Sequence, residues 1–192
     1  MSAPTATMTP PADAAQGPSF PEILRAAQQG DGWALEHLFH LLSGRIRAFL
    51  TARGLEDPEA SASEVFVRAF RAIADFEGDQ SAYEAWIFTI ARRLAIDEHR
   101  RAERRPHQVE DDQLAEREAP DDVEVQAVEQ LDQSDAQALL DGLSPDQREV
   151  VVLRIIAGLS TEQVSEILDK RPDAVRALQH RGLANIRRRI SP

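Results

Sequence analysis

Arginine, glutamine and histidine side chains gather near the end of the chain, at Arg171, Arg176, Gln179, His180 and Arg181. Arginine and glutamine can bind base edges in the major groove of duplex DNA, and further arginines can pair with phosphate. Arg187 to Arg189, closer to the end, could instead complement the dipole at a helix C-terminus. Taken together, these residue types and this spacing predict a face that binds nucleic acid.

A second group of arginines lies in the middle of the chain, at Arg92, Arg93, Arg100, Arg101, Arg104 and Arg105. The whole chain has a formal net charge of −11, which would argue against a nucleic-acid partner if the charges were evenly spread. Most of the net negative charge lies in one segment, His107 to Asp135, which has eleven acidic residues and one arginine. Two basic patches therefore flank one acidic connector.

The elements that must position the last group are helical. Ser144 to Gln147 has a serine cap, a proline at the first helical position and a glutamine at the third, and predicts a helix start. Ser160 and Gln163 form a second capping box, which opens a short helix ending at Leu168. A turn over 169–171 follows, and Pro172 begins the final helix. A short helix, a three-residue turn and a longer basic helix predict a helix-turn-helix.

The first half of the chain is also predicted to be helical. Apolar residues at steps of three and four predict a helix over about 31–53, after a short helix over 21–29. Asp57 and Pro58 predict the start of the next helix, and Ser81 with Glu84 reads as a capping box that opens a helix running into the central arginines. The fold class is therefore all-α.

Composition divides the chain into a flexible tail (1–20), a helical domain (21–105), an acidic linker (106–133) and a helix-turn-helix domain (134–192). The absence of cysteine excludes disulfides and thiolate metal sites. The first twenty residues lack the basic start and apolar run of a signal peptide, and no later segment has the length of apolar sequence that a membrane helix needs. We expect a cytoplasmic protein with no membrane insertion, no cofactor and no enzymatic activity.

Two stretches together resemble the extracytoplasmic-function (ECF) sigma factors of the sigma-70 family: AWIFTIARRLAIDEHRRAERR (85–105) and LSPDQREVVVLRIIAGLSTEQVSEILDKRPDAVRALQHRGLANIRRRI (143–190). The order of the two stretches, with an acidic linker between them, matches that family. The resemblance implies a subunit that binds core RNA polymerase and directs it to promoters. It also implies that the linker threads through the active-site cleft of the polymerase, although a solvated spacer would look the same.

The resemblance assigns roles to particular residues. The second domain would read the minus-35 element as duplex DNA, through the group at Arg171 to Arg181. The first would capture the melted minus-10 element, for which single-stranded DNA needs a cationic track and a pocket for an extruded base. The residues implied for minus-10 DNA are Phe76, Asp79, Gln80, Arg92, Arg93, Arg100 and Arg101. Those implied for polymerase binding are Ser61, Glu64, Arg68 and Arg71. Trp86 and Phe88 are expected to be core residues.

The sequence departs from the family in two places. The chain reads Ala-Ser-Ala-Ser-Glu over 60–64, where the family has an Asp-Leu-Val-Gln-Glu type of run facing the polymerase clamp. This departure predicts weaker polymerase binding, a compensating contact from the tail, or loss of sigma activity. In the turn, Asp169 stands where glycine is usual and the proline, Pro172, comes about one residue late. The recognition helix could therefore be tilted.

Two other functions compete with this interpretation. One is a DNA-binding regulator that descends from a sigma factor and no longer engages polymerase. The other is an enzyme with Glu36, His37 and His40 as metal ligands on one helix, where the spacing puts His37 and His40 on neighbouring turns but no third ligand is evident. For a sigma factor we also expect an anti-sigma partner, or an internal restraint by the tail over 1–20, since free basic faces would otherwise always be available.

Overall fold

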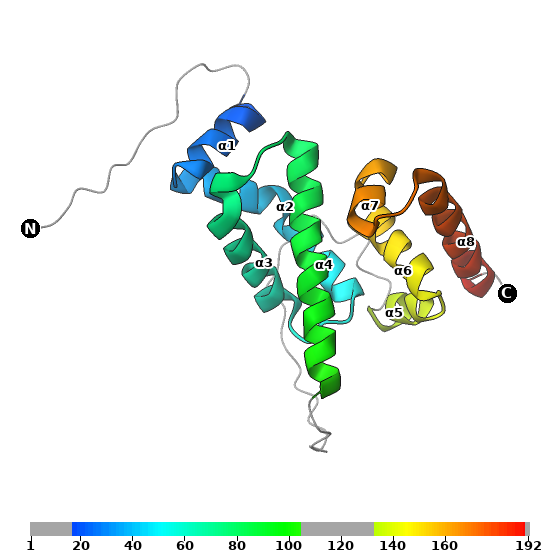
Figure 1. Cartoon of the computed structure of the whole chain (residues 1–192). Coiled ribbons are helices and arrows are strands. Elements are labelled where there is room, and N and C mark those ends of the chain that lie inside the picture. Colours follow the sequence, from blue (N-terminus) through cyan, green and yellow to red (C-terminus); the bar gives the residue numbers. More distant parts are fainter. Residues whose placement is uncertain (1–16, 105–132, 191–192) are drawn as a thin grey trace, which may run out of the picture.

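The protein is described by a computed structural model, which places residues 17–104 and 133–190 (Figure 1). Residues 1–16 of the predicted tail (1–20) and residues 106–132 of the predicted linker (106–133) lie outside the described residues. The first part, which we call the first lobe, contains α1 (Phe20–Gln28), α2 (Gly32–Ala52), α3 (Pro58–Ala72), the 3-10 turn η1 (Ile73–Asp75) and α4 (Gln80–Arg104). The second lobe contains α5 (Gln133–Asp141), α6 (Pro145–Val151), the π-helical turn η2 (Val152–Ile156), α7 (Thr161–Leu168) and α8 (Pro172–Ile190). The described residues form only helices and the connections between them, so the all-α prediction is confirmed.

Most of the predicted helix starts are confirmed by their caps. The Asp57 carboxylate accepts a hydrogen bond from the backbone N–H of Ala60 at 2.9 Å. Reciprocal capping boxes open α6 at Ser144 and α7 at Ser160. These bonds satisfy backbone donors that the first turn of a helix leaves without partners.

The predicted capping box at Ser81 is wrong. Helix α4 begins at Gln80, and the carboxylate that accepts from its first turn is Asp79, whose Oδ1 lies 2.8 Å from the backbone nitrogen of Ala82. Asp79 is as good a cap as serine and comes two residues earlier, so Ser81 falls inside the helix. Glu84 does not reach back to the cap and instead pairs with Arg45 at 3.0 Å.

The core of the first lobe is built around α2. Its apolar stripe, Leu38, Leu42, Ile46 and Phe49, has no exposed side-chain surface and meets residues of α1, α3 and α4. Burial of such side chains contributes roughly 1.5–3 kcal/mol each to folding. The stripe therefore holds three other helices, including the long α4 that carries the central arginines.

In the second lobe, α6 and α8 approach closely because Gly182 has no side chain. A Cβ at this position would lie 2.7 Å from Cγ2 of Val151. After Val151 the helix continues as the π-helical turn η2, which the sequence did not predict. This extra bulge rotates the side chains that follow and is common at functional sites.

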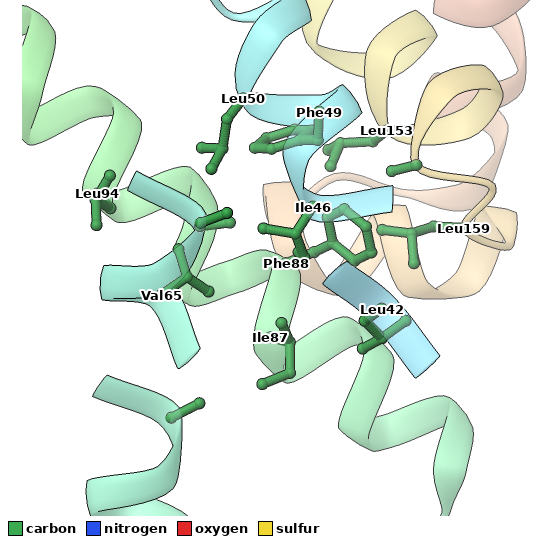
Figure 2. Close-up of a cluster of buried hydrophobic side chains, with 14 of the residues drawn as sticks. Leu42, Ile46, Phe49, Leu50, Val65, Ile87, Phe88, Leu94, Leu153 and Leu159 are labelled. Carbon is green, nitrogen blue, oxygen red and sulfur yellow. The ribbon is translucent and has the colours of Figure 1, made fainter. Parts of the chain in front are cut away.

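The two lobes share one apolar cluster. Phe49 of α2 and Phe88 of α4 are fully buried, and so are Leu153 and Leu159 of the second lobe. Figure 2 shows Leu153 next to Phe49 and Leu159 next to Phe88. The lobes are therefore packed against each other, in addition to being joined through the chain.

Candidate nucleic-acid interface

The predicted helix-turn-helix is present and exposes the expected cations. The chain leaves α7 through the predicted turn, where Asp169 has φ of 50° and so takes the left-handed conformation, which aspartate tolerates better than most residues. Pro172 then opens α8. Four of the five predicted residues, Arg171, Arg176, His180 and Arg181, are exposed, and Gln179 is half-buried. The first half of α8 thus presents a cationic surface to solvent.

Carboxylates lie among these arginines. The Asp173 carboxylate is 2.6 Å from Nη2 of Arg176 and 3.8 Å from Nη2 of Arg171. The backbone N–H of Glu162 and the hydroxyl of Ser160 lower the pKa of Glu162, with smaller contributions from Arg176 and Arg154. A phosphate that binds Arg176 must therefore compete with Asp173 for the guanidinium.

Gln179 is oriented by a residue outside the helix-turn-helix. Nε of Arg154, on η2, donates to Oε1 of Gln179 at 3.1 Å, and the Arg154 Nη1 also donates to the carbonyl of Leu159. The Gln179 oxygen therefore faces Arg154, which leaves its amide nitrogen as the group free to donate to a base. No pattern in the sequence indicates this contact, because the π-helical turn places Arg154.

The first-lobe loop predicted to bind melted DNA forms a shallow hollow. Its walls are Ala72, Asp75, Phe76, Glu77 and Trp86. The Phe76 and Trp86 rings stack with centroids 4.9 Å apart, and Nε2 of Gln28 donates to the carbonyl of Phe76 at 2.9 Å, which fixes the loop. Trp86 is thus half-buried at the hollow, whereas Phe88 is a core residue as expected. Of the other predicted residues here, Asp79 caps α4 and Gln80 donates to Glu84 at 3.3 Å.

The central arginines on α4 do not form one uniform row. Arg93, Arg100 and Arg101 are exposed. Arg92 is half-buried, and its Nε is 2.7 Å from the carboxylate of Glu149 in the second lobe. Three of the four predicted cations are therefore open to a ligand and one is occupied.

On α3, one of the residues predicted to bind polymerase is buried. Ser61 is 6% exposed, and its hydroxyl donates to the Glu98 carboxylate at 3.2 Å. Ala62 is also buried, so the small residues at 61 and 62 lie in the interior of the lobe and are not part of an exposed surface. The outward face of α3 carries Glu64, Arg68 and Arg71, together with Val67, which is 42% exposed. Glu64 and Arg68 form an ion pair at 2.7 Å.

The candidate metal ligands are on the surface of α2. His40 lies 3.7 Å from Glu36, and both side chains are mostly exposed, as is His37. Within 17–104 and 133–190, no group of three or more His, Cys, Asp or Glu side chains is placed to hold a metal ion. Among the same residues, no helix is both long and apolar enough to cross a membrane.

Comparison with known proteins gives two family matches. The family described as Sigma-70 region 2 matches residues 37–105, and that described as Sigma-70, region 4 matches residues 133–186. The chain is 37% identical over 134 residues to the ECF RNA polymerase sigma factor ShbA of Streptomyces griseus, covering 67% of this chain and 69% of ShbA. It is 30% identical over 172 residues to the ECF RNA polymerase sigma factor BldN of Streptomyces coelicolor, covering 87% of this chain and 64% of BldN. The chain thus spans about two thirds of the length of these relatives.

Solved structures share the fold. CnrH, in complex with the cytosolic domain of CnrY, aligns with a TM-score of 0.66 at 20% identity, over 88% of this chain and 94% of CnrH. RpoE of Bartonella quintana, in complex with the anti-sigma factor NepR, aligns with a TM-score of 0.58 at 21% identity, over 80% of this chain and 94% of RpoE. With its two region matches in order and a relative at 37% identity, the chain belongs to the family of ECF RNA polymerase sigma factors.

Proposed function

We propose that this protein is a sigma factor that binds core RNA polymerase and directs promoter-specific initiation of transcription. The observation that carries the proposal is that one chain contains both sigma-70 regions in order, with the region 4 match ending in a helix-turn-helix whose second helix exposes arginines. The second lobe would read minus-35 duplex through Arg171, Arg176 and Arg181, with Gln179 and His180 beside them. The first half of a recognition helix is the part that reaches base edges in the major groove.

The first lobe would hold the melted minus-10 strand. The hollow at Phe76 and Trp86 offers aromatic faces for an extruded base, and the exposed arginines of α4 offer a cationic track for the backbone. In this proposal the protein itself catalyses no reaction and acts in the cytoplasm, beside the polymerase. We also retain the domain boundaries predicted from composition, 21–105 and 134–192, with the segment 106–133 between them.

The outward face of α3 is the surface that we assign to polymerase. Val67 supplies exposed apolar area there, next to Glu64, Arg68 and Arg71. We further propose an anti-sigma partner, since the solved complexes of CnrH and RpoE are complexes with CnrY and with the anti-sigma factor NepR.

Co-elution with purified core RNA polymerase that lacks any sigma factor tests this proposal. We expect a stable complex with the full chain and a weaker one with Val67→Glu. The exposed α2 residue Ala48 provides the matched control, and Ala48→Glu should bind as the unmodified chain does. Failure of the full chain to bind core polymerase, with duplex binding retained, would support the alternative of a sigma-derived DNA-binding regulator.

A further inference from the structure

One carboxylate of the second lobe binds two arginines of the first. Oε1 of Glu149 on α6 is 2.7 Å from Nε of Arg92 on α4, and Oε2 pairs with Nη1 of Arg53, the residue that ends α2. The exposed fractions of the three side chains are 15% for Glu149, 30% for Arg92 and 13% for Arg53. Two guanidinium groups this close and this buried need an anion between them.

The rest of the contact between the lobes fixes where Glu149 lies. Arg45 donates through Nε and Nη2 to the carbonyl oxygen of Ala157, at 2.9 and 2.6 Å. Nε2 of Gln163 donates to the carbonyl of Ser81 at 2.8 Å. These bonds add to the packing of the shared apolar cluster (Figure 2), so Glu149 is held at the two arginines by packing as well as by charge.

We propose that Arg53 and Arg92 form a phosphate-binding site for single-stranded DNA, and that Glu149 occupies this site as long as the lobes are packed together. This inference rests on the proposed function, which gives the first lobe a single-stranded ligand. A guanidinium group binds phosphate in the same forked geometry as it binds carboxylate, so the two anions compete for one place. The lobes must therefore separate before this site can take DNA.

One of the two arginines of the site lies on the helix that carries the other cations of the first lobe. Arg92 lies on α4 next to Arg93, whose side chain is exposed, and Arg100 and Arg101 are exposed further along the same helix. A strand that follows α4 would meet the open cations first and the occupied pair only after Glu149 leaves. In the second lobe, by contrast, the arginines of α8 are exposed while the lobes are packed, so duplex binding does not require separation.

Glu149→Gln removes the negative charge and keeps the size of the side chain. It leaves Arg53 and Arg92 close together without a counter-ion, which favours separation of the lobes. Two further phosphate contacts should steepen the dependence of log K on log salt by about 1.4 for single-stranded DNA. We expect this steeper dependence together with about tenfold tighter binding at low salt, because each contact releases counterions.

The experiment uses the full chain, which has no cysteine of its own, labelled at Ser63→Cys on α3 and Glu166→Cys on α7 for energy transfer. Both positions are exposed, and neither is among the residues assigned above to DNA. Binding of a fluorescent single-stranded oligonucleotide is measured by anisotropy over a range of salt concentrations. Glu59→Gln is the matched control, since Glu59 pairs with Arg47 at 3.3 Å on the exposed surface of the first lobe.

We expect Glu149→Gln to lower the energy transfer and tighten oligonucleotide binding, and Glu59→Gln to change neither. Adding Arg53→Ala and Arg92→Ala to Glu149→Gln should remove the gain in affinity, and it should return the transfer toward that of the parent, because the repulsion between the two guanidinium groups is also removed. Unchanged energy transfer in Glu149→Gln would contradict the claim that Glu149 occupies the two arginines while the lobes are packed. Lower energy transfer without tighter oligonucleotide binding would contradict the claim that Arg53 and Arg92 bind phosphate. Neither readout contains polymerase, so these outcomes are separate from failure of the proposed function, which appears as loss of core binding.

Discussion

The carboxylate of Glu149 lies 2.7 Å from Nε of Arg92, across the contact between the two lobes. Arg92 was predicted from the sequence as a contact to minus-10 DNA, together with Arg93, Arg100 and Arg101. The structure places the last three at the surface and gives Arg92 a protein partner. The two candidate DNA-binding surfaces therefore differ, because the arginines of α8 are open and the surface on α4 is partly covered.

Replacing Arg176 tests whether α8 binds the minus-35 element as duplex DNA. Arg176→Ala should weaken binding to minus-35 duplex by roughly 1–3 kcal/mol if the guanidinium makes a base contact. Asp173→Ala should act in the opposite direction, because Asp173 pairs with Arg176 at 2.6 Å and competes with DNA. Titration of labelled duplex at fixed salt measures both, and equal affinities in all three proteins would move recognition to other residues.

Tyr83 offers a test of the first-lobe core by pH. It is the only tyrosine, it is fully buried, and its hydroxyl has no hydrogen-bond partner among the described residues. Burial raises the pKa of Tyr83 above the ordinary value. In the unfolded chain the phenol loses its proton near pH 10, before the folded one does, so stability is full below about pH 10 and declines above it.

Tyr83→Phe should therefore remove the decline in stability at alkaline pH. It should also raise the free energy of unfolding at neutral pH by about 1 kcal/mol, because it removes a buried hydroxyl that lacks a partner. Urea unfolding at neutral pH and at pH above 10 measures both effects. A loss of stability in Tyr83→Phe at neutral pH would mean that the hydroxyl has a partner after all.

Two glycines on helices should respond to alanine in opposite directions. A Cβ at Gly182 would lie 2.7 Å from Cγ2 of Val151, so Gly182→Ala should destabilise the second lobe by about 1–2 kcal/mol through overpacking. A Cβ at Gly44 on α2 would meet open space, so Gly44→Ala should stabilise the folded protein by about 0.5–1 kcal/mol through helix propensity. Thermal unfolding distinguishes them, and a stabilised Gly182→Ala would refute the close approach of α6 and α8.

The turn before α8 can be tested at Asp169. This residue has φ of 50°, a conformation that costs glycine little and alanine more. Asp169→Gly should raise the free energy of unfolding by up to about 1 kcal/mol, and Asp169→Ala should lower it by a similar amount. Chemical denaturation of the two variants, compared with the parent, measures the difference. The same stability in both would show that the left-handed turn is not required.

Local signals in the sequence predicted most of the helices. The helix starts predicted at Asp57, Ser144 and Ser160 depend only on residues that are close together in the sequence, and so does the apolar period of α2. Each of these predictions is confirmed. The predicted start of α4 was wrong because Asp79 and Ser81 are both good capping residues. Only the path of the preceding loop determines which of them caps the helix. The burial of Ser61 was missed because its predicted orientation came from a resemblance, whereas the packing of α3 on α4 decides it.

The contact between the lobes could not be predicted from local patterns. Arg92 and Glu149 are 57 residues apart, and Arg53 and Glu149 are 96 apart, with a charged segment between the lobes. From the sequence, Arg53 and Arg92 could equally be solvated residues or DNA-binding residues, because charge alone does not specify a partner. The π-helical turn that carries Arg154 was likewise set by packing, since its sequence continues the apolar run of α6.

Transcription in vitro tests whether this protein directs core RNA polymerase to promoters. Purified core polymerase and the full chain are incubated with a pool of genomic promoter fragments, and the transcript starts are sequenced. A sigma factor should give discrete starts that follow shared minus-35 and minus-10 elements at a fixed spacing, and fewer of them with Arg176→Ala. Absence of transcripts from a chain that still binds duplex DNA would contradict this function.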